Sequence, residues 1–479
     1  MVIAATTKVS RKKTVTTSSP AAGPYRVAAG EGAVASTISP ELALRRAVLA
    51  CMLWEDIAYE NGASVVDNIR DLVKQVDPQT VASIAVEARE KQKLRHVPLM
   101  LVREMARLDS HKGLVASTLD RVIARPDEIS EFLALYWKEK KEPLSNQVKK
   151  GLAKAFRKFD EYQISKYAGN KKSSIKLRDA LFLVHAKPQG QDQVDLWKKL
   201  ANRDLTSPDT WEVALSEGKG TDKKETWERL VSERKLGAMA LLRNLRNMID
   251  AGVDEGIIRQ ALVSCKADKV LPFRFIAAEK EAPKFRGELE TLMLSCLKTV
   301  DKIKGKTIVV VDVSGSMKSN LSGKSNMNRQ SAAMALAMLI KGVSEECIVY
   351  ATAGNDCSRE GKSERISDNL KGFALADAIE RAARSLGGGG IFLKHCVDYA
   401  AKDAKTADTL IIISDSQDCS GDDSPKRVVP FGKFNYMMDI SCHRHGIAYE
   451  KFTVLNGFSE ALVDYVVQEE KVLNDGEKK

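Results

Sequence analysis

Long apolar runs are missing from this 479-residue sequence. No stretch approaches the roughly 20 consecutive apolar residues that a helix needs to cross a bilayer, which predicts a chain that is not integrated into a membrane. Apolar residues make up 44% of the sequence and charged residues 29%, a balance typical of a soluble globular protein. The length exceeds that of one ordinary hydrophobic core and predicts two or three domains.

Cysteine is sparse, and no two cysteines form a CxxC pair. Eight scattered cysteines in a chain of this length indicate a reducing compartment and mostly buried thiols, so we expect a cytoplasmic protein. Cys442, His443 and His445 lie close together, but no second ligand pair has suitable spacing, and a solvated helix end is favoured over zinc. Carboxylate pairs in a catalytic setting are also missing, and we therefore expect no enzyme.

Acidic residues are absent before Glu31, in a segment rich in Ser, Thr, Ala, Gly and Pro. This composition predicts a disordered basic arm over residues 1–38, with an organelle transit peptide as the alternative. Residues 1–304 carry 53 Lys and Arg against 40 Asp and Glu, whereas residues 305–479 carry 22 against 24. The first part holds the whole basic excess, and a polyanion is its natural partner.

Apolar residues recur at three- and four-residue spacing from about Pro40 to Val300, which predicts helices throughout this part. Ser39 as N-cap and Pro40 at the first helical position mark the first start. We expect helices over residues 39–54, 64–76, 78–92, 97–108, 113–124, 127–139, 145–167, 175–186, 192–201, 226–234, 237–252 and 288–300. Such closely spaced helices predict stacked antiparallel pairs over residues 39–304, an α-solenoid of the HEAT type, although no clear sequence repeat is present.

The pattern changes at Gly305, where buried β-branched runs begin to alternate with helices. We expect strands over residues 307–314, 347–354, 409–416 and 448–456. The intervening and final helices are expected over residues 328–343, 375–386, 394–404, 434–446 and 461–473. This alternation predicts a second domain over residues 305–479, an α/β fold with a doubly wound parallel sheet.

Polar side chains follow two of the expected strands. Asp312, Ser314 and Ser316 form a D-x-S-x-S loop where the first strand ends, and Asp415 lies at the end of the third. The carboxyl ends of parallel strands are where ligands bind, and hard divalent cations prefer oxygen ligands. The sequence therefore predicts a site for Mg²⁺ or another divalent cation, with an ordinary strand-to-helix turn capped by Ser as the alternative.

The densest basic stretch runs over residues 138–178, with 13 Lys and Arg against 4 Asp and Glu. On one helix, Lys150, Lys154, Arg157 and Lys158 would share a face opposite an apolar stripe. Phosphate contact is the functional interpretation, and a solvated Lys-rich surface is the alternative. The candidate RNA-binding residues of this stretch are Lys149, Lys150, Lys154, Arg157, Lys158, Lys166, Lys171 and Lys172.

Arg243 and Arg246 offer a second candidate surface, three residues apart in "MALLRNLRNM". RNA contact is the functional interpretation, and the family resemblance given below implies that this contact would lie in the central hole of a ring. Polar packing between helices is the alternative.

The α/β half resembles the von Willebrand factor A domain and its metal-ion-dependent adhesion site, on the stretches "DVSGSM" and "SDSQD". That family also places a Thr in the loop before the fourth helix, commonly after a run of glycines. Here the loop reads "SLGGGGIFLKHC", so Gly390 or Ile391 stands at the Thr position and one oxygen ligand is missing.

The helical half resembles the TROVE module of the Ro ribonucleoprotein (Ro/SSA autoantigen) family. The resemblance rests on the stretches "LACMLWED", "LRHVPLMLVREMARL", "SKYAGNKKSSIKLRDALFLVHAKP", "MALLRNLRNM" and "VLPFRFIAAE". In that family the module precedes a von Willebrand A domain, and the resemblance covers about residues 40–479. It implies a ring of HEAT-like repeats whose ends the A domain bridges.

The same resemblance implies partners and site residues. It implies small structured Y or Y-like RNA on the basic outer surface, single-stranded 3′ ends of misfolded RNA in the ring, and polynucleotide phosphorylase as a nuclease partner in bacteria. Lys166 and His185 match positions that the family uses at its RNA surface, and Asn170, Lys171 or Lys172 stands for the family's next basic residue. A monomeric protein within a ribonucleoprotein that acts in non-coding RNA quality control is expected.

Two other functions compete with this interpretation. One is a protein-interaction scaffold whose A-domain metal captures an acidic partner residue. The other, a metal-dependent nuclease, has little support, because Asp312 and Asp415 make one incomplete site whereas phosphodiester cleavage commonly uses two metals.

Overall fold

The computed structural model describes most of the chain. It describes residues 39–49, 62–169, 174–206, 208–217, 222–267, 270, 272–297, 301–321, 327–355, 357–415, 428–440, 451–457 and 461–476. The predicted basic arm over residues 1–38 therefore lies outside the described residues. Within them, no helix is long and apolar enough to cross a membrane.

The first part of the chain is helical, as predicted. Its α-helices are α1 Pro40–Leu49, α2 Gly62–Val73, α3 Pro78–Glu90, α4 His96–Arg107, α5 Lys112–Val122, α6 Pro126–Tyr136, α7 Asn146–Phe156, α8 Glu161–Ala168, α9 Leu177–Val184, α10 Gln191–Asn202, α11 Trp211–Glu217, α12 Lys223–Ser232, α13 Ala238–Asp250, α14 Glu255–Ser264, α15 Pro272–Glu281 and α16 Arg286–Cys296. The 3-10 turn η1 Pro283–Phe285 leads into the last of these. Local signals account for many starts: α1 begins at Pro40, and the Asp77 and Ser145 side chains cap α3 and α7.

The helix predicted over residues 145–167 is wrong, because the structure has two helices there. Helix α7 ends at Phe156, and α8 starts at Glu161. Asp160 caps α8 by accepting the Gln163 backbone N–H at 2.7 Å, and the Gln163 side chain accepts the Asp160 N–H in return. This capping box favours a new helix start over continuation of α7. Helices α11, α14 and α15 were not predicted.

The apolar faces of the helices form two successive cores. One core joins α1 to α10, from Ala43 to Leu200. The second starts around α12, continues through α16 and runs without a break into one face of the β-sheet. The end of the helical part and the second domain therefore share a single hydrophobic core.

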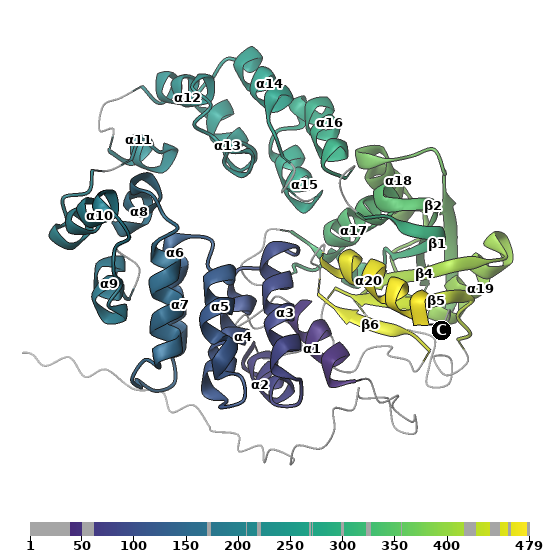
Figure 1. Cartoon of the computed structure of the whole chain (residues 1–479). Helices are drawn as coiled ribbons and strands as arrows, with labels where there is room; N and C mark the ends of the chain where they lie inside the picture. The colour runs from purple at the N-terminus through teal and green to yellow at the C-terminus, as the bar shows by residue number, and fades with distance from the viewer. Residues whose placement is uncertain are drawn as a thin grey trace, which may run out of the picture.

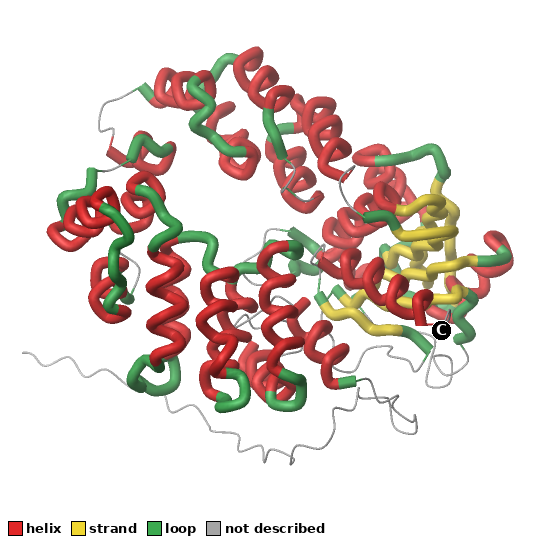
Figure 2. The backbone as a smooth tube through the Cα atoms, in the orientation of Figure 1, coloured by secondary structure: helices red, strands yellow, loops and turns green. Residues whose placement is uncertain are grey.

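The second domain contains a six-stranded sheet in the order β3-β2-β1-β4-β5-β6. The strands are β1 Ile303–Asp312, β2 Ser344–Asn355, β3 Glu360–Ile366, β4 Ala407–Ser414, β5 Gly432–Asp439 and β6 Thr453–Asn456. Only β3, at the edge, is antiparallel to its neighbour. Helices α17 Arg329–Val343, α18 Gly372–Ser385 and α20 Ala461–Gly476 cover one face, and α19 Leu393–Ala404 covers the other (Figure 2). The predicted doubly wound α/β fold is confirmed.

One expected helix of this domain is wrong. Residues 434–439, expected to be helical, belong to strand β5, which pairs with β4 from Ala407 to Ser414. The alternation "KFNYMMD" buries Tyr436 on one face of the sheet and Met437 on the other. Pairing on both sides of β5 overrides the helical spacing of its apolar residues. Strand β3 was also missed.

The second domain closes the helical part into a ring (Figure 1). At one end α15 packs on α17 and α16 packs on α18, with Phe373 donating its backbone N–H to Glu290 at 2.8 Å. At the other end α1 packs against β6, and the Arg46 guanidinium donates to the Tyr465 hydroxyl at 3.5 Å. The first and last elements of the chain therefore lie side by side, and the predicted ring of helical repeats bridged by an α/β domain is confirmed.

A buried carboxyl group on α20 makes the stability of this closure depend on pH. Glu470 is 5% exposed and accepts the Thr409 hydroxyl at 2.7 Å. Burial, reinforced by the nearby charges of Glu469 and Asp408, raises the pKa of Glu470 to about 7. Because the folded-state pKa lies above the unfolded value, this group stabilises the fold fully at acid pH, and the stabilisation is lost as the pH rises through about 7.

We expect Glu470→Gln, which keeps the shape and stays neutral, to be more stable than wild type at pH 8 by on the order of 2 kcal/mol. At pH 5 the two proteins should differ little, since Glu470 is then protonated in the folded state. Urea unfolding followed by circular dichroism at the two pH values measures the difference. A gap of equal size at both pH values would contradict the argument.

Candidate nucleic-acid interface and cation site

A surface groove of about 700 Å³ lies between the α6–α7 connection and α9. Trp137, Lys141 and Lys149 line one side, and Phe182 and His185 line the other. The groove therefore combines two aromatic rings with side chains that carry or can accept a positive charge. Lys149 and His185 are residues that the sequence predicts to bind RNA.

The aromatic rings of the groove each have a cation beside them. The Phe182 side chain is 56% exposed, and the Arg178 guanidinium lies 5.8 Å from its ring centre. The Lys141 ammonium lies 5.8 Å from the centre of the Trp137 ring. An accessible ring next to a cation is suited to stacking of an unpaired base whose phosphate the cation neutralises.

The orientation of Trp137 is fixed by one hydrogen bond: its indole N–H donates to the Glu142 carbonyl at 2.6 Å. All five tryptophans of the sequence lie in the helical half, which predicts packing between helices rather than a stacking platform. That prediction is confirmed for Trp197 and Trp227, which are 5% and 2% exposed, but Trp137 is only half buried and lines the groove. Trp54 lies outside the described residues.

Phe182 was missed because it lies off the apolar stripe of its helix. Helix α9 buries Leu177, Leu181 and Val184, and this periodicity turns Phe182 and Leu183 to the opposite side. Two adjacent apolar residues on the solvent face of a short helix are the signal that could have identified the groove.

The lysines on either side of the turn after α7 are available for a ligand. Lys150 and Lys154 are exposed one helical turn apart on α7, and Lys166 is exposed near the end of α8. Within the described part of the chain, none of these three side chains forms a hydrogen bond or an ion pair. His185 is also exposed, at the C-cap of α9 with φ 51°. The structure thus leaves four of the predicted RNA-binding side chains free to contact phosphate.

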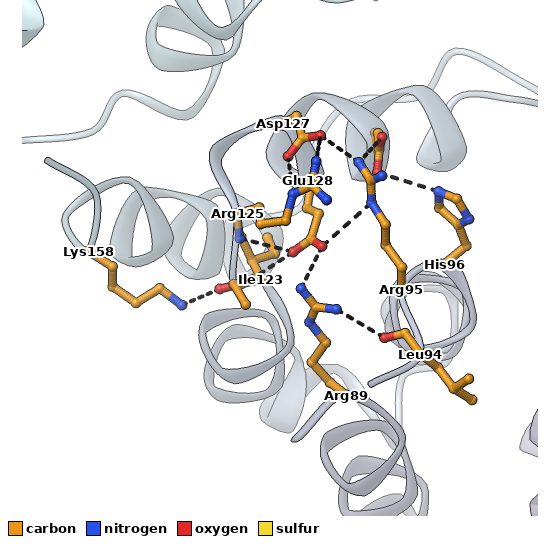
Figure 3. A network of polar contacts seen from close by, with 11 residues as sticks. Arg89, Leu94, Arg95, His96, Ile123, Arg125, Asp127, Glu128 and Lys158 are labelled. Atoms are coloured by element: carbon orange, nitrogen blue, oxygen red, sulfur yellow. Dashed lines mark hydrogen bonds and ion pairs between the residues drawn. The ribbon is translucent and has the colours of Figure 1, made fainter. Parts of the chain in front are cut away.

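Two other predicted RNA ligands serve the fold instead. The Lys158 ammonium donates to the Ile123 carbonyl at 2.6 Å (Figure 3). It also donates to the Asp120 carbonyl and so caps the end of α5. Burial lowers the pKa of this ammonium. Arg157 donates through Nε to the Lys187 carbonyl at 3.2 Å. The shared cationic face predicted for these residues is wrong, because α7 ends at Phe156 and both side chains turn toward neighbouring loops.

Lys158 borders a buried network of ion pairs centred on Glu128, which is fully buried (Figure 3). Its carboxylate accepts the backbone N–H groups of Ala124 and Arg125 at 2.8 and 3.1 Å and the Arg89 guanidinium at 2.6 Å. Arg95 bridges Asp127 and Glu131 on the same helix, at 2.5 Å to each. The network joins α3, α4 and α6, so these charges stabilise the stacking of the helical repeats.

The second predicted surface lies on α13. Leu242 and Leu245 are buried, while Arg243 and Arg246 are exposed. Arg246 pairs with Glu281 of α15 at 3.2 Å, which agrees with the alternative of polar packing between helices. Arg243 has no partner among the described residues.

Several candidate residues cannot be placed. Lys171 and Lys172, together with Asn170, lie outside the described residues. The same holds for Cys442, His443 and His445.

The D-x-S-x-S loop follows β1 at the carboxyl edge of the sheet. Asp312 is fully buried, and its two oxygens accept the Ser314 backbone N–H at 2.8 Å and the Ser414 hydroxyl at 2.7 Å. The hydroxyls of Ser314 and Ser316 lie 3.1 Å apart. Burial, reinforced by the nearby charge of Asp415, raises the pKa of Asp312 to about 7. The structure therefore brings the four predicted metal ligands to one edge of the sheet.

An arginine also reaches this site. The Arg329 guanidinium donates through Nη1 to Asp415 Oδ2 at 2.7 Å, and the two side chains are 7% and 0% exposed. Arg329 is the first residue of α17. Sequence analysis did not single it out, because nothing local distinguishes it from an arginine at an exposed helix start.

The loop at the expected Thr position approaches the D-x-S-x-S loop through its backbone. Gly315 donates its N–H to the Gly389 carbonyl at 3.3 Å, and a Cβ on Gly315 would lie 2.7 Å from the Gly388 carbonyl oxygen. Ile391 is fully buried in the apolar core under α19. Residues 386–393 of this loop carry no side-chain oxygen that could take the place of the Thr.

These residues do not fit a divalent cation in the predicted manner. The Arg329 guanidinium already binds the Asp415 carboxylate, and the Ser314 N–H and the Ser414 hydroxyl donate to Asp312. The oxygen of the expected Thr is missing, because Gly390 or Ile391 stands at its position. In the part of the chain that the structure describes, no three His, Cys, Asp or Glu side chains gather as a metal site.

Comparisons with known proteins point to one family. A model of the TROVE domain matches residues 198–345, and a model of the Ro60 vWA domain matches residues 306–443. Among solved structures, the crystal structure of the Deinococcus radiodurans Ro (RSR) protein is similar, with a TM-score of 0.64 and 17% sequence identity over 90% of this chain and 99% of that one. No curated protein matches the chain by sequence.

Proposed function

We propose that this chain, which belongs to the Ro family and joins a TROVE domain to a von Willebrand A domain, is a non-enzymatic RNA-binding component of a ribonucleoprotein. The observation that carries the proposal is the groove beside α9. It places accessible aromatic rings next to cations, and lysines without a protein partner lie on the adjoining helices. This is the combination of stacking surface and phosphate contact that single-stranded and looped RNA requires.

The finer assignment concerns the kind of RNA. Small structured RNA of the Y or Y-like class would bind along α7 to α9, with an unpaired loop base in the groove and phosphates on Lys150, Lys154 and Lys166. Single-stranded 3′ ends of misfolded RNA would enter the ring, and Arg243 of α13, exposed and without a partner among the described residues, is the candidate contact. The protein would act as a cytoplasmic monomer in non-coding RNA quality control, as an adaptor to an exoribonuclease such as polynucleotide phosphorylase.

Photocrosslinking tests the proposal directly. The protein is purified at low salt, and bound RNA is detected by the ratio of absorbance at 260 and 280 nm before and after nuclease treatment. After irradiation, we expect crosslinked peptides to contain Trp137 or Phe182, and sequencing of the attached RNA to identify its class. Bound RNA should stay intact when Mg²⁺ is added, as expected for a protein that binds RNA without cleaving it.

Two results would contradict the proposal. One is protein free of nucleic acid at low salt, and the other is crosslinks confined to the A domain. The latter would favour a protein-interaction scaffold, although the contact of Arg329 with Asp415 leaves that function without its metal.

A further inference from the structure

We propose that Arg329 is a built-in cation of the A domain. Its guanidinium takes the place that a divalent metal would take beside Asp415, so the domain keeps its loop geometry without a metal ion. The inference is independent of RNA binding, since it concerns the edge of the sheet and the start of α17.

The contact itself is the first argument. Arg329 Nη1 lies 2.7 Å from Asp415 Oδ2, and both side chains are almost completely removed from solvent. A buried carboxylate is stable only when a charge or strong hydrogen bonds compensate it, and a buried guanidinium has the same requirement. Each of these two groups therefore needs the other in the absence of a metal.

The position of Arg329 on its helix is the second argument. It is the first residue of α17, and the N-terminus of a helix disfavours a positive charge. The backbone there is held firmly, because the Arg329 N–H donates to the Ser319 carbonyl at 2.9 Å and the Asn328 side chain caps the helix at the Ser331 N–H. An arginine in this unfavourable position is explained by the carboxylate that faces it.

Charge balance is the third argument. With Arg329 present, Asp312 and Asp415 together with the guanidinium leave at most one negative charge at the site. A divalent ion would then make the site positive and would lie close to another cation in a dry environment, where repulsion is strong. Without the arginine, two carboxylates and one divalent ion would be neutral. The cation at this position is therefore the guanidinium of Arg329, which is part of the chain and cannot exchange with solvent as a metal ion can.

The same helix start connects the site to the ring. The Lys280 ammonium of α15 donates to the Ser331 hydroxyl at 2.7 Å, two residues after Arg329. Arg329 fixes the start of α17 without a metal. The stability of this junction between the ring and the A domain should therefore not depend on the divalent cation concentration. An acidic partner residue would find no metal to bind here.

The test compares wild type with Arg329→Met, which keeps the length of the side chain and removes its charge. Wild type should melt at the same temperature in EDTA and in millimolar Mg²⁺ or Mn²⁺, and should give no binding heat with either ion. In EDTA, Arg329→Met should melt about 5–10 °C lower, because the buried Asp415 carboxylate loses its ion pair with the guanidinium. Mg²⁺ or Mn²⁺ should recover most of that loss, since the metal can now take the vacated position.

Two further variants complete the experiment. Arg286→Met removes another arginine with carboxylate partners, Glu279 and Asp377, and should show no response to metal. If Arg329→Met does not fold, Arg329→Met with Asp415→Asn removes both charges and should fold without responding to Mg²⁺. Binding of Mg²⁺ to wild type at micromolar concentrations, or a lower melting temperature of wild type in EDTA, would overturn the proposal. So would an Arg329→Met protein as stable as wild type in EDTA.

Discussion

Replacing Lys150, Lys154 and Lys166 together with glutamate is expected to weaken the binding of a hairpin RNA with a single-stranded tail by at least about 100-fold near physiological salt. All three side chains are exposed and have no partner among the described residues. Each phosphate contact releases a counterion, so the slope of log affinity against log salt should become shallower by about 2–3. Fluorescence anisotropy over a series of salt concentrations measures both quantities.

A matched triple variant separates this local effect from that of net charge. Lys362, Arg381 and Lys402 are exposed on the A domain, and their replacement by glutamate changes the net charge of the protein by the same amount. We expect that protein to lose little affinity and to keep the wild-type salt slope. Equal losses in the two variants would mean that RNA responds only to the overall charge, and the assigned surface would be wrong.

Lys158 is deliberately left out of the binding variant. A single helix over residues 145–167 would place Lys158 on the same face as Lys154. The capping box at Asp160 ends that continuity, and the ammonium then reaches back to the end of α5. A sequence shows the charge of a lysine but not which carbonyl it will meet 35 residues earlier in the chain.

The fold was predictable where apolar periodicity is strong and local. The start of α1 at Pro40 and the buried strands β1 and β4 follow directly from their residues. Strand β5 and edge strand β3 did not, because pairing with neighbouring strands determines them. The residues proposed as metal ligands do lie at one edge of the sheet, yet Arg329, which contacts Asp415 there, lies 86 residues from it in the sequence.

Removal of the Glu128 carboxylate is expected to destabilise the helical part strongly. Glu128 is fully buried, and it is the acceptor for Arg89 and for two backbone N–H groups at the start of α6. Burial raises the pKa of this carboxyl, even though three arginines surround it. Truncation removes the acceptor of Arg89 Nη2, whose side chain is 13% exposed, and of the Ala124 and Arg125 backbone N–H groups. Breaking a buried ion pair in this way typically costs about 3–5 kcal/mol of the free energy of unfolding.

Glu128→Ala should therefore unfold at a clearly lower urea concentration than wild type, and the amides of α3, α4 and α6 should exchange faster with solvent. Glu131→Ala is the matched control on the same helix. The Glu131 side chain is 34% exposed and also pairs with Arg95, but solvent can replace its contacts. We therefore expect Glu131→Ala to lose about 1 kcal/mol or less of the free energy of unfolding.

Equal effects of the two substitutions would show that burial does not distinguish these carboxylates. A small effect of both would show that the ion-pair network contributes little to the stacking of the repeats. The larger loss is expected at Glu128 because its carboxylate is fully buried, whereas the Glu131 side chain is 34% exposed.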